Sequence, residues 1–385
     1  GSTALNNITV NGAALSAAAV TASGDVSVTN SGTSTISGVI AANSFTKAGA
    51  GQLTFKPSNA TGSKTLNAGS AVLSADSQMN NLSGSANINI SSNDITLNNS
   101  SSTTYSGVLS GSGNLIKTGN ETITLSGTNT YSGNTTISAG TLSISGRLGS
   151  GTYLGTIANS GIFSYTSSSA QTISGAISGS GQITKSGAST LTLSGTNTYS
   201  GGTTISAGAI TVSGLLGNGS YAGSISNAGT LTLSSSSAQT LSGAISGSGG
   251  ITKSGSGNLT LSGNSDFTGA VTLSSGTLIA AANNSLGSSP SINSSASKVL
   301  QLSEGVTLPS LAVTGAISLE SDITTTGAQS YSAATVIGAS SGSAVTLATT
   351  NSNITFSDNV NIYQNTTINT GSGAGNVTFG GTLGS

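Results

Sequence analysis

Nine carboxylates are the only plausible catalytic groups of this 385-residue chain, because it contains no His and no Cys. Three of them fall in one stretch, Glu304, Glu320 and Asp322. Glu320 and Asp322 are separated by a single residue, so on a strand both would face one side, and Glu304 lies about one short coil earlier. Such a group could bind Ca²⁺ or supply the acid and base of a polysaccharide-cleaving site. The alternative is a solvated acidic face that discourages lateral aggregation. No catalytic residue and no cofactor is predicted.

A second group of residues recurs at a fixed spacing and could contact a ligand. A lysine series of this kind could match a periodic anionic glycan, or it could protect turns and strand edges against strand addition. The recurring tyrosines could form an aromatic ligand platform, or they could pack over the backbone of a turn. This candidate ligand-contact ladder consists of Lys47, Lys117, Lys185, Lys253, Tyr131 and Tyr199.

Composition excludes several classes of function. Only 4% of the residues are charged, the formal net charge is −1, and Gly contributes 56 residues. Eight Lys and Arg residues in such a length cannot form a stripe that follows phosphates, so nucleic acid is not an expected partner. The longest apolar tract, at 13–20, is far shorter than the roughly 20 residues of a membrane-spanning helix. A signal peptide is not recognisable, so we expect any such segment to have been removed.

The positions of these residues depend on an internal repeat. The segment GSGQITKSGASTLTLSGTNTYSGGTTISAGAI at 179–210 recurs almost unchanged at 111–142 and more loosely at 247–278, always with the same offset in residue number. A repeat of fixed period must stack on its neighbours to bury its apolar face. We therefore expect residues 1–385 to form one continuous solenoid. Its predicted parts are N-terminal coils at 1–102, repeats at 103–170, 171–238 and 239–286 (the last degraded), and coils of another subtype at 287–385.

Within the repeat, apolar residues alternate with polar ones, which predicts strands separated by turns rich in Gly, Ser and Asn. Four apolar anchors span one repeat unit and divide it into about three coils: Leu191, Ile210, Leu231 and Leu259. Coils of this length predict an all-β fold, an elongated right-handed parallel β-helix or β-solenoid.

The segments at 111–142 and 179–210 resemble the autotransporter-associated β-strand repeat, also called the passenger-associated transport repeat. The resemblance directly covers 103–278 and implies a bacterial passenger domain of type V secretion. It implies a right-handed β-helix that is exported unfolded through an outer-membrane translocator and lies outside the cell, at the outer-membrane surface or secreted. Alternating lipid-facing strands with aromatic girdles are not found in the sequence. We therefore expect the translocator beyond residue 385 or another route of export.

Three functions follow from these observations. The first is a non-enzymatic adhesin or scaffold for adhesion, aggregation or biofilm, with host or neighbouring cells, matrix or glycans as partners. The second is a fibre subunit whose terminal coils join molecules end to end into a homopolymer, since such a contact does not close. The third, more remote, is a polysaccharide-active β-helix enzyme that uses the acidic group.

Overall fold

A computed structural model describes residues 8–57, 62–288, 290–295, 298–340 and 342–384. In these ranges the chain forms short β-strands that pair in parallel, together with two 3-10 turns, η1 (Gly149–Gly151) and η2 (Gly217–Gly219), and no α-helix. The sequence alternation explains the strands, because in β33 (Thr230–Leu233) the side chains of Leu231 and Leu233 are buried and that of Thr230 is exposed. No helix among these residues is long and apolar enough to cross a membrane. The predicted all-β, parallel β-helical fold is confirmed.

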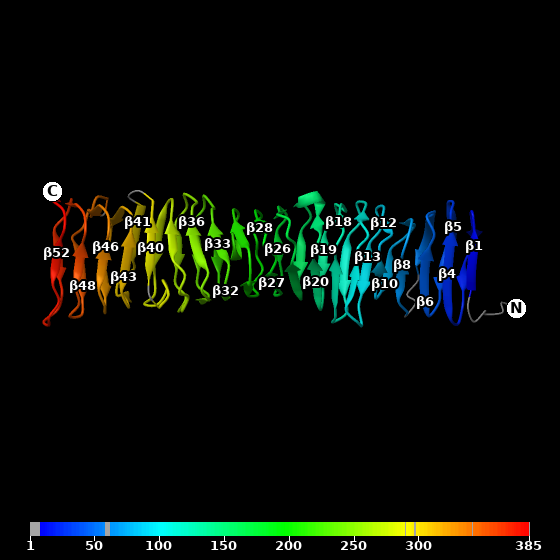
Figure 1. Cartoon of the computed structure of the whole chain (residues 1–385), viewed down its shortest axis with the longest axis horizontal. Coiled ribbons are helices and arrows are strands. Elements are labelled where there is room, and N and C mark those ends of the chain that lie inside the picture. The colour runs from blue at the N-terminus through cyan, green and yellow to red at the C-terminus, as the bar shows by residue number, and fades with distance from the viewer. Residues whose placement is uncertain (1–7, 58–61, 289, 296–297, 341, 385) are drawn as a thin grey trace. The chain divides into compact units, whose positions relative to one another are not determined.

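The chain forms two compact units, residues 1–191 and 192–385, and each is described by itself. In the first unit, successive strands pass from one parallel sheet to the next and return to the first sheet one coil later. Figure 1 shows these strands from blue to green. Sheet I contains β1 (Ile8–Gly12), β4 (Asp25–Asn30), β6 (Ser44–Ala48), β8 (Lys64–Leu66), β11 (Ser83–Gly84), β14 (Thr103–Tyr105), β17 (Thr122–Leu125), β20 (Thr141–Ile144), β24 (Ile162–Tyr165) and β27 (Gln182–Lys185). Sheet II contains β2 (Ser16–Ala17), β5 (Ser34–Ala41), β7 (Gln52–Pro57), β9 (Ser70–Leu73), β12 (Asn87–Asn89) and β15 (Leu109–Ser110), and β3 (Val20–Thr21) also pairs with β5. Sheet III contains β10 (Ser77–Asn80), β13 (Ile95–Asn98), β16 (Leu115–Thr118), β19 (Thr135–Ile137), β23 (Ile157–Asn159) and β26 (Ile177–Ser178). Two short pairs complete the unit, β18 (Thr128–Asn129) with β21 (Arg147–Leu148), and β22 (Thr152–Tyr153) with β25 (Gln171–Ile173).

The second unit follows the same plan, and β28 (Thr190–Leu193) lies at the boundary. Sheet IV contains β30 (Ala209–Val212), β33, β36 (Gly250–Lys253), β38 (Val271–Leu273), β40 (Ser291–Ser294), β43 (Leu311–Thr314), β46 (Gln329–Tyr331), β49 (Ile354–Phe356) and β52 (Val377–Phe379). Sheet V contains β31 (Ser220–Tyr221), β34 (Gln239–Leu241), β37 (Leu259–Leu261), β39 (Thr277–Ala280), β41 (Lys298–Leu302), β44 (Ile317–Leu319), β47 (Thr335–Ile337), β50 (Val360–Ile362) and β53 (Leu383–Gly384). Sheet VI contains β42 (Thr307–Leu308), β45 (Ile323–Thr325), β48 (Val345–Thr349) and β51 (Thr366–Asn369), and sheet VII contains β29 (Thr203–Ile205), β32 (Ile225–Asn227) and β35 (Ile245–Ser246).

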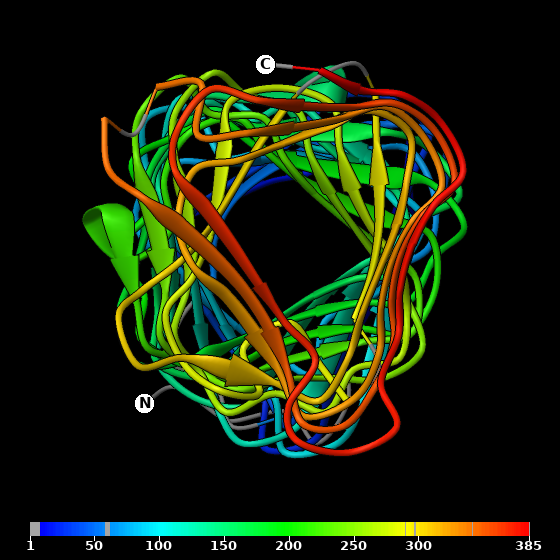
Figure 2. The same cartoon turned by 90° about the vertical axis from the view of Figure 1, so that its left-hand side faces the viewer.

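The core of each unit is a set of apolar rows that run from coil to coil. In sheet IV, Ile210, Leu231, Ile251 and Val271 are paired in register, and each is at most 1% exposed. Viewed end on in Figure 2, the coils of the second unit, coloured green to red, trace three sides around this interior. Burying one such side chain stabilises the fold by about 1.5–3 kcal/mol. Cumulative stacking therefore replaces the disulfides that the chain lacks.

The repeat length differs from the prediction of about three coils. Leu115 pairs with Thr135, Thr135 with Ile157 and Ile157 with Ile177, so three coils of sheet III lead from Leu115 only as far as Ile177. The residue at the repeat position of Leu115 is Ile183, and it pairs with Phe163 in sheet I. Each repeat is thus three coils plus one further side.

The second unit shows the same advance of one side. Three coils of sheet IV lead from Ile210 to Val271, whereas Leu278, at the repeat position of Ile210, pairs with Leu259 in sheet V. The predicted coil step from Ile210 to Leu231 is confirmed. The predicted step from Leu231 to Leu259 is wrong, because the next coil places Ile251 on Leu231. Periodicity located the strands, but it could not distinguish a full turn from a turn plus one side.

The domain prediction is neither confirmed nor contradicted. Each unit is a stack of parallel coils, and the coils after residue 286 continue sheets IV and V. Residues 1–7 and 385, which belong to the predicted terminal parts, lie outside the described residues. That residues 1–385 form one continuous solenoid stays a prediction.

Candidate functional site

The four repeated lysines lie inside the solenoid. Lys47, Lys117 and Lys185 are 0% exposed and Lys253 is 2% exposed. Lys117 pairs with Leu97 on the coil below and with Ile137 on the coil above, so its stem fills an apolar row. No repeated basic group reaches the surface, which contradicts the predicted ligand ladder and also the alternative of an edge-protecting lysine.

The ammonium groups are held by the backbone at a corner of the coil. Nζ of Lys117 donates to the carbonyl oxygens of Thr118, of Gly119 at 2.7 Å and of Ala139, on the next coil, at 3.3 Å. Lys47 donates in the same way to Ala48, Gly49 and Ala68 at 2.9, 2.7 and 3.1 Å. Gly119 is required at this corner because its φ is +71° and a Cβ would lie 2.3 Å from the Asn99 carbonyl oxygen. We call this arrangement the lysine cage.

Burial dominates the electrostatics of the cages. It lowers the pKa of Lys117 to about 8, against an opposing effect of the Glu121 carboxylate. Burial also lowers the pKa of Lys47, Lys185 and Lys253. The ammonium groups of Lys47 and Lys117 each donate to three backbone carbonyls, one of them on the next coil, and Lys253 also reaches the next coil at the Ser275 carbonyl. These lysine cages therefore join neighbouring coils.

Tyr131 and Tyr199 are also interior, at 1% and 0% exposure, so the prediction of an aromatic ligand platform is wrong. The hydroxyl of Tyr131 is 2.8 Å from that of Thr135, which is 2.7 Å from the hydroxyl of Tyr153. Tyr153 donates to the Gly133 carbonyl at 2.5 Å, and desolvation raises the pKa of both phenols.

The same network recurs one repeat later, in Tyr199, Thr203, Tyr221 and the Gly201 carbonyl. Thr135, Tyr153 and their repeat partners were not among the residues predicted from the sequence. The signal was present, because both Thr and Tyr recur at the repeat spacing.

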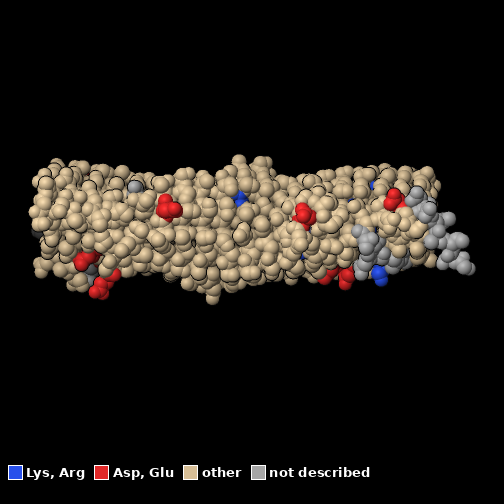
Figure 3. Space-filling model, turned by 90° about the horizontal axis from the view of Figure 1, so that it is seen from below, with Lys and Arg blue, Asp and Glu red and all other residues tan. Residues whose placement is uncertain are grey.

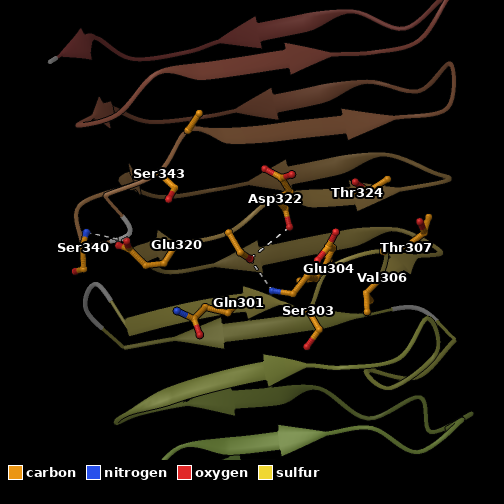
Figure 4. A pocket seen from close by; sticks show the side chains of 14 residues that line it. Gln301, Ser303, Glu304, Val306, Thr307, Glu320, Asp322, Thr324, Ser340 and Ser343 are labelled. Carbon is orange, nitrogen blue, oxygen red and sulfur yellow. Dashed lines mark hydrogen bonds between the residues drawn. The ribbon is translucent and has the colours of Figure 1, made fainter.

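The three predicted acidic residues line one open hollow of about 800 Å³ in the second unit. Glu320 and Asp322 lie on the corner between β44 and β45, not on a strand as predicted. Figure 4 shows the turn that carries Glu304 on one side of them and the segment with Ser340 and Ser343 on the other. The corner explains why the carboxylates do not share one face.

Two of the three carboxylates in the hollow accept hydrogen bonds from backbone N–H groups. Glu320, 7% exposed, accepts hydrogen bonds from the Ser318 hydroxyl and from the Ser340 N–H at 2.8 Å. Asp322 accepts the Thr346 N–H at 2.7 Å, and Glu304 is exposed. Among the described residues no three acidic side chains lie close enough together to hold a metal ion, so Glu304, Glu320 and Asp322 do not assemble the candidate Ca²⁺ site.

The solvent-exposed surface carries few charged residues. Acidic residues outnumber basic ones there by more than they do in the sequence, because more of the basic residues are buried. Five of the eight basic residues are buried, Lys47, Lys64, Lys117, Lys185 and Lys253. Of the nine acidic residues only Glu320 is buried. Figure 3 shows the few charged groups scattered over a surface of other residues. The polar part of this surface therefore consists chiefly of hydroxyl, amide and backbone groups.

Comparisons with known proteins give one family. The model of the passenger-associated transport repeat matches residues 45–70, 115–144, 183–212 and 251–280. No curated protein and no solved structure matches the chain.

The four matches include all four lysine cages, since each contains one of the repeated lysines. The repeat is a structural element of passengers rather than a mark of an enzyme family, and it implies a location outside the cell or at the outer membrane. The chain thus contains four matches to the passenger-associated transport repeat on a parallel β-solenoid, an arrangement consistent with an autotransporter passenger domain.

Proposed function

We propose that the chain is a non-enzymatic adhesin or scaffold that acts outside the cell, at a bacterial outer-membrane surface or after secretion. Its partners are the surface of a host or neighbouring cell, matrix or glycans. The observation that carries this proposal is the burial of every repeated ionisable side chain, because it leaves a repetitive polar exterior without repeated charge. Many weak polar contacts along such a surface give avidity without one deep pocket.

Binding of the purified chain to cellulose, chitin and mannan, and to cultured cells, tests this proposal. Since the contacts are between uncharged groups, we expect adhesion to persist at high salt. A double variant, Glu304→Gln with Asp322→Asn, should adhere like the unaltered chain. Failure of the chain to bind any of these surfaces would refute the adhesive function. Polysaccharide cleavage that the double variant abolishes would establish the enzymatic alternative.

End-to-end assembly is a second candidate, and one feature favours it. β52 and β53 are the last strands of sheets IV and V, and Val377, Phe379 and Leu383 on them are 39%, 40% and 59% exposed. Phe379 continues a stack with Phe356 at 5.2 Å and Tyr331. These side chains and the open strand edges offer a surface on which a coil of another molecule can pack. Electron microscopy with light scattering over a range of concentrations tests assembly, and persistent monomers would exclude it.

A further inference from the structure

We infer that successive repeats present the same exposed surface on successive sides of the solenoid, so that one chain bridges two bodies that carry the same ligand. The inference rests on the adhesive function proposed above and concerns its geometry. A repeat of whole coils would place every copy on one side. The advance of one side in each repeat places consecutive copies on different sides.

The first unit contains two equivalent corners that show this. Ser112 and Ser180, one repeat apart, are both exposed, and each follows a glycine with a positive φ, +117° at Gly111 and +100° at Gly179. The local backbone is therefore the same. Ser112 precedes β16 in sheet III, whereas Ser180 precedes β27 in sheet I. The same surface thus faces two directions.

The second unit also contains two equivalent corners before strands of different sheets, but the exposed residue differs between the two copies. Thr198 and Asp266 are one repeat apart and exposed, and Tyr199 and Phe267 beside them are both buried. The following strands, β29 and β38, belong to sheets VII and IV. Asp266 gives this third copy a charge that the earlier copies lack. The matched surfaces of the first unit are therefore the better test.

The consequence for binding follows from this geometry. Three and a third coils, at about 4.8 Å per coil, separate equivalent corners by roughly 16 Å along the solenoid. When one copy contacts a flat surface, the next copy faces away from that surface. It is then available to a second body at high effective concentration. Because the exposed groups are uncharged hydroxyls, the matching partner is a neutral glycan on two cells or particles.

The geometry can be tested without the natural ligand, since the chain has no cysteine of its own. Two double variants of the full chain, each labelled with biotin on a short linker, are compared. In Ser112→Cys with Ser180→Cys the labels lie on different sides. In the control, Ser112→Cys with Ser132→Cys, they lie one coil apart on one side, because the Ser132 N–H bonds to the Gly111 carbonyl at 2.9 Å. We expect the first pair, but not the control, to join streptavidin beads to a streptavidin-coated plate. Equal bridging by both would overturn the inference.

The functional arm uses beads coated with whichever of cellulose, chitin or mannan binds the chain. Chains shown to be monomeric by light scattering should agglutinate these beads. Replacing one copy, Ser112→Arg, should lower agglutination about threefold or more relative to attachment. Adding Ser132→Arg to this variant should lower agglutination only a little further, because Ser132 lies on the same side as Ser112. Attachment without agglutination would overturn this inference alone. Absence of any attachment would instead refute the adhesive function.

Discussion

Lys117 shows how a charged side chain can stabilise an apolar interior. Lys117→Ala removes the stem from the row between Leu97 and Ile137 and leaves the carbonyls of its cage without a donor. We expect a loss of about 2–5 kcal/mol in the free energy of unfolding. Lys117→Met keeps the stem and should cost only about 1–2 kcal/mol. Urea unfolding followed by circular dichroism measures both. The exposed Lys56→Met is the control and should change the value by less than about 0.5 kcal/mol.

The buried titratable groups should make the free energy of unfolding largest at an alkaline pH. The pKa of Lys117 is about 8 in the folded chain against 10.5 otherwise, so between these values the unfolded chain binds more protons and stability rises with pH. The pKa values of Tyr131 and Tyr199 are raised above 10.0, so above that pH the unfolded chain loses protons first and stability falls. Thermal unfolding at increasing pH should therefore peak near pH 10. Lys117→Met should flatten the rise and Tyr131→Phe the fall, and a steady decrease from neutral pH would contradict this assignment.

At the scale of the element, the corners of the coils decide which strands stack. In the first unit Asp94 accepts the Asn114 N–H at 3.1 Å, Asn114 accepts the Asn134 N–H at 2.8 Å, and Asn134 accepts the Thr156 N–H at 2.9 Å. Asn114→Ala removes the acceptor of the Asn134 N–H and the side-chain amide donation from Asn114 to Asp94 at 2.9 Å, whereas the Asn114 N–H can still bond to Asp94. We expect a loss of about 1–3 kcal/mol and faster amide exchange at Asn134. Asn120→Ala, on an exposed corner outside the ladder, is the matched control, and an equal loss there would refute the role of the ladder.

The sequence predicted the elements better than it predicted the direction of side chains. Alternation fixed strands such as β33, and the repeat fixed the parallel stack. Lys117 was predicted at the surface because a lysine in a strand of alternating residues is usually exposed. Its position, two residues after the inward-facing Leu115, nevertheless points its side chain to the interior. Its cage depends on the Ala139 carbonyl of the next coil, which no local pattern reveals. Glu320 and Asp322 were misplaced because the strand ends at Leu319, and the corner turns the two carboxylates apart.

At the scale of the whole molecule, the repeat of three coils and one side predicts which deletions the solenoid tolerates. Removing residues 115–182 deletes one complete repeat and joins Asn114 to Ile183. The new neighbours then reproduce native pairs, with Ile183 over Ile95 in place of Leu115, and Lys185 over Leu97 in place of Lys117. We expect this variant to fold with nearly unchanged thermal stability.

Removing residues 115–176 instead deletes three whole coils and keeps every later strand on its own side. It places Gly179, with a φ of +100°, over Leu97, so the row loses an inward side chain there. Lys117 and the carbonyls of its cage are removed together. The void over Leu97 should lower the melting temperature below that of the variant that lacks a complete repeat. Circular dichroism melts and protease resistance of the two variants compare them directly. If the variant that lacks three whole coils is the more stable, keeping each strand on its own side of the solenoid matters more for stability than restoring native side-chain pairs. The length of the repeat would then not be explained by these pairs.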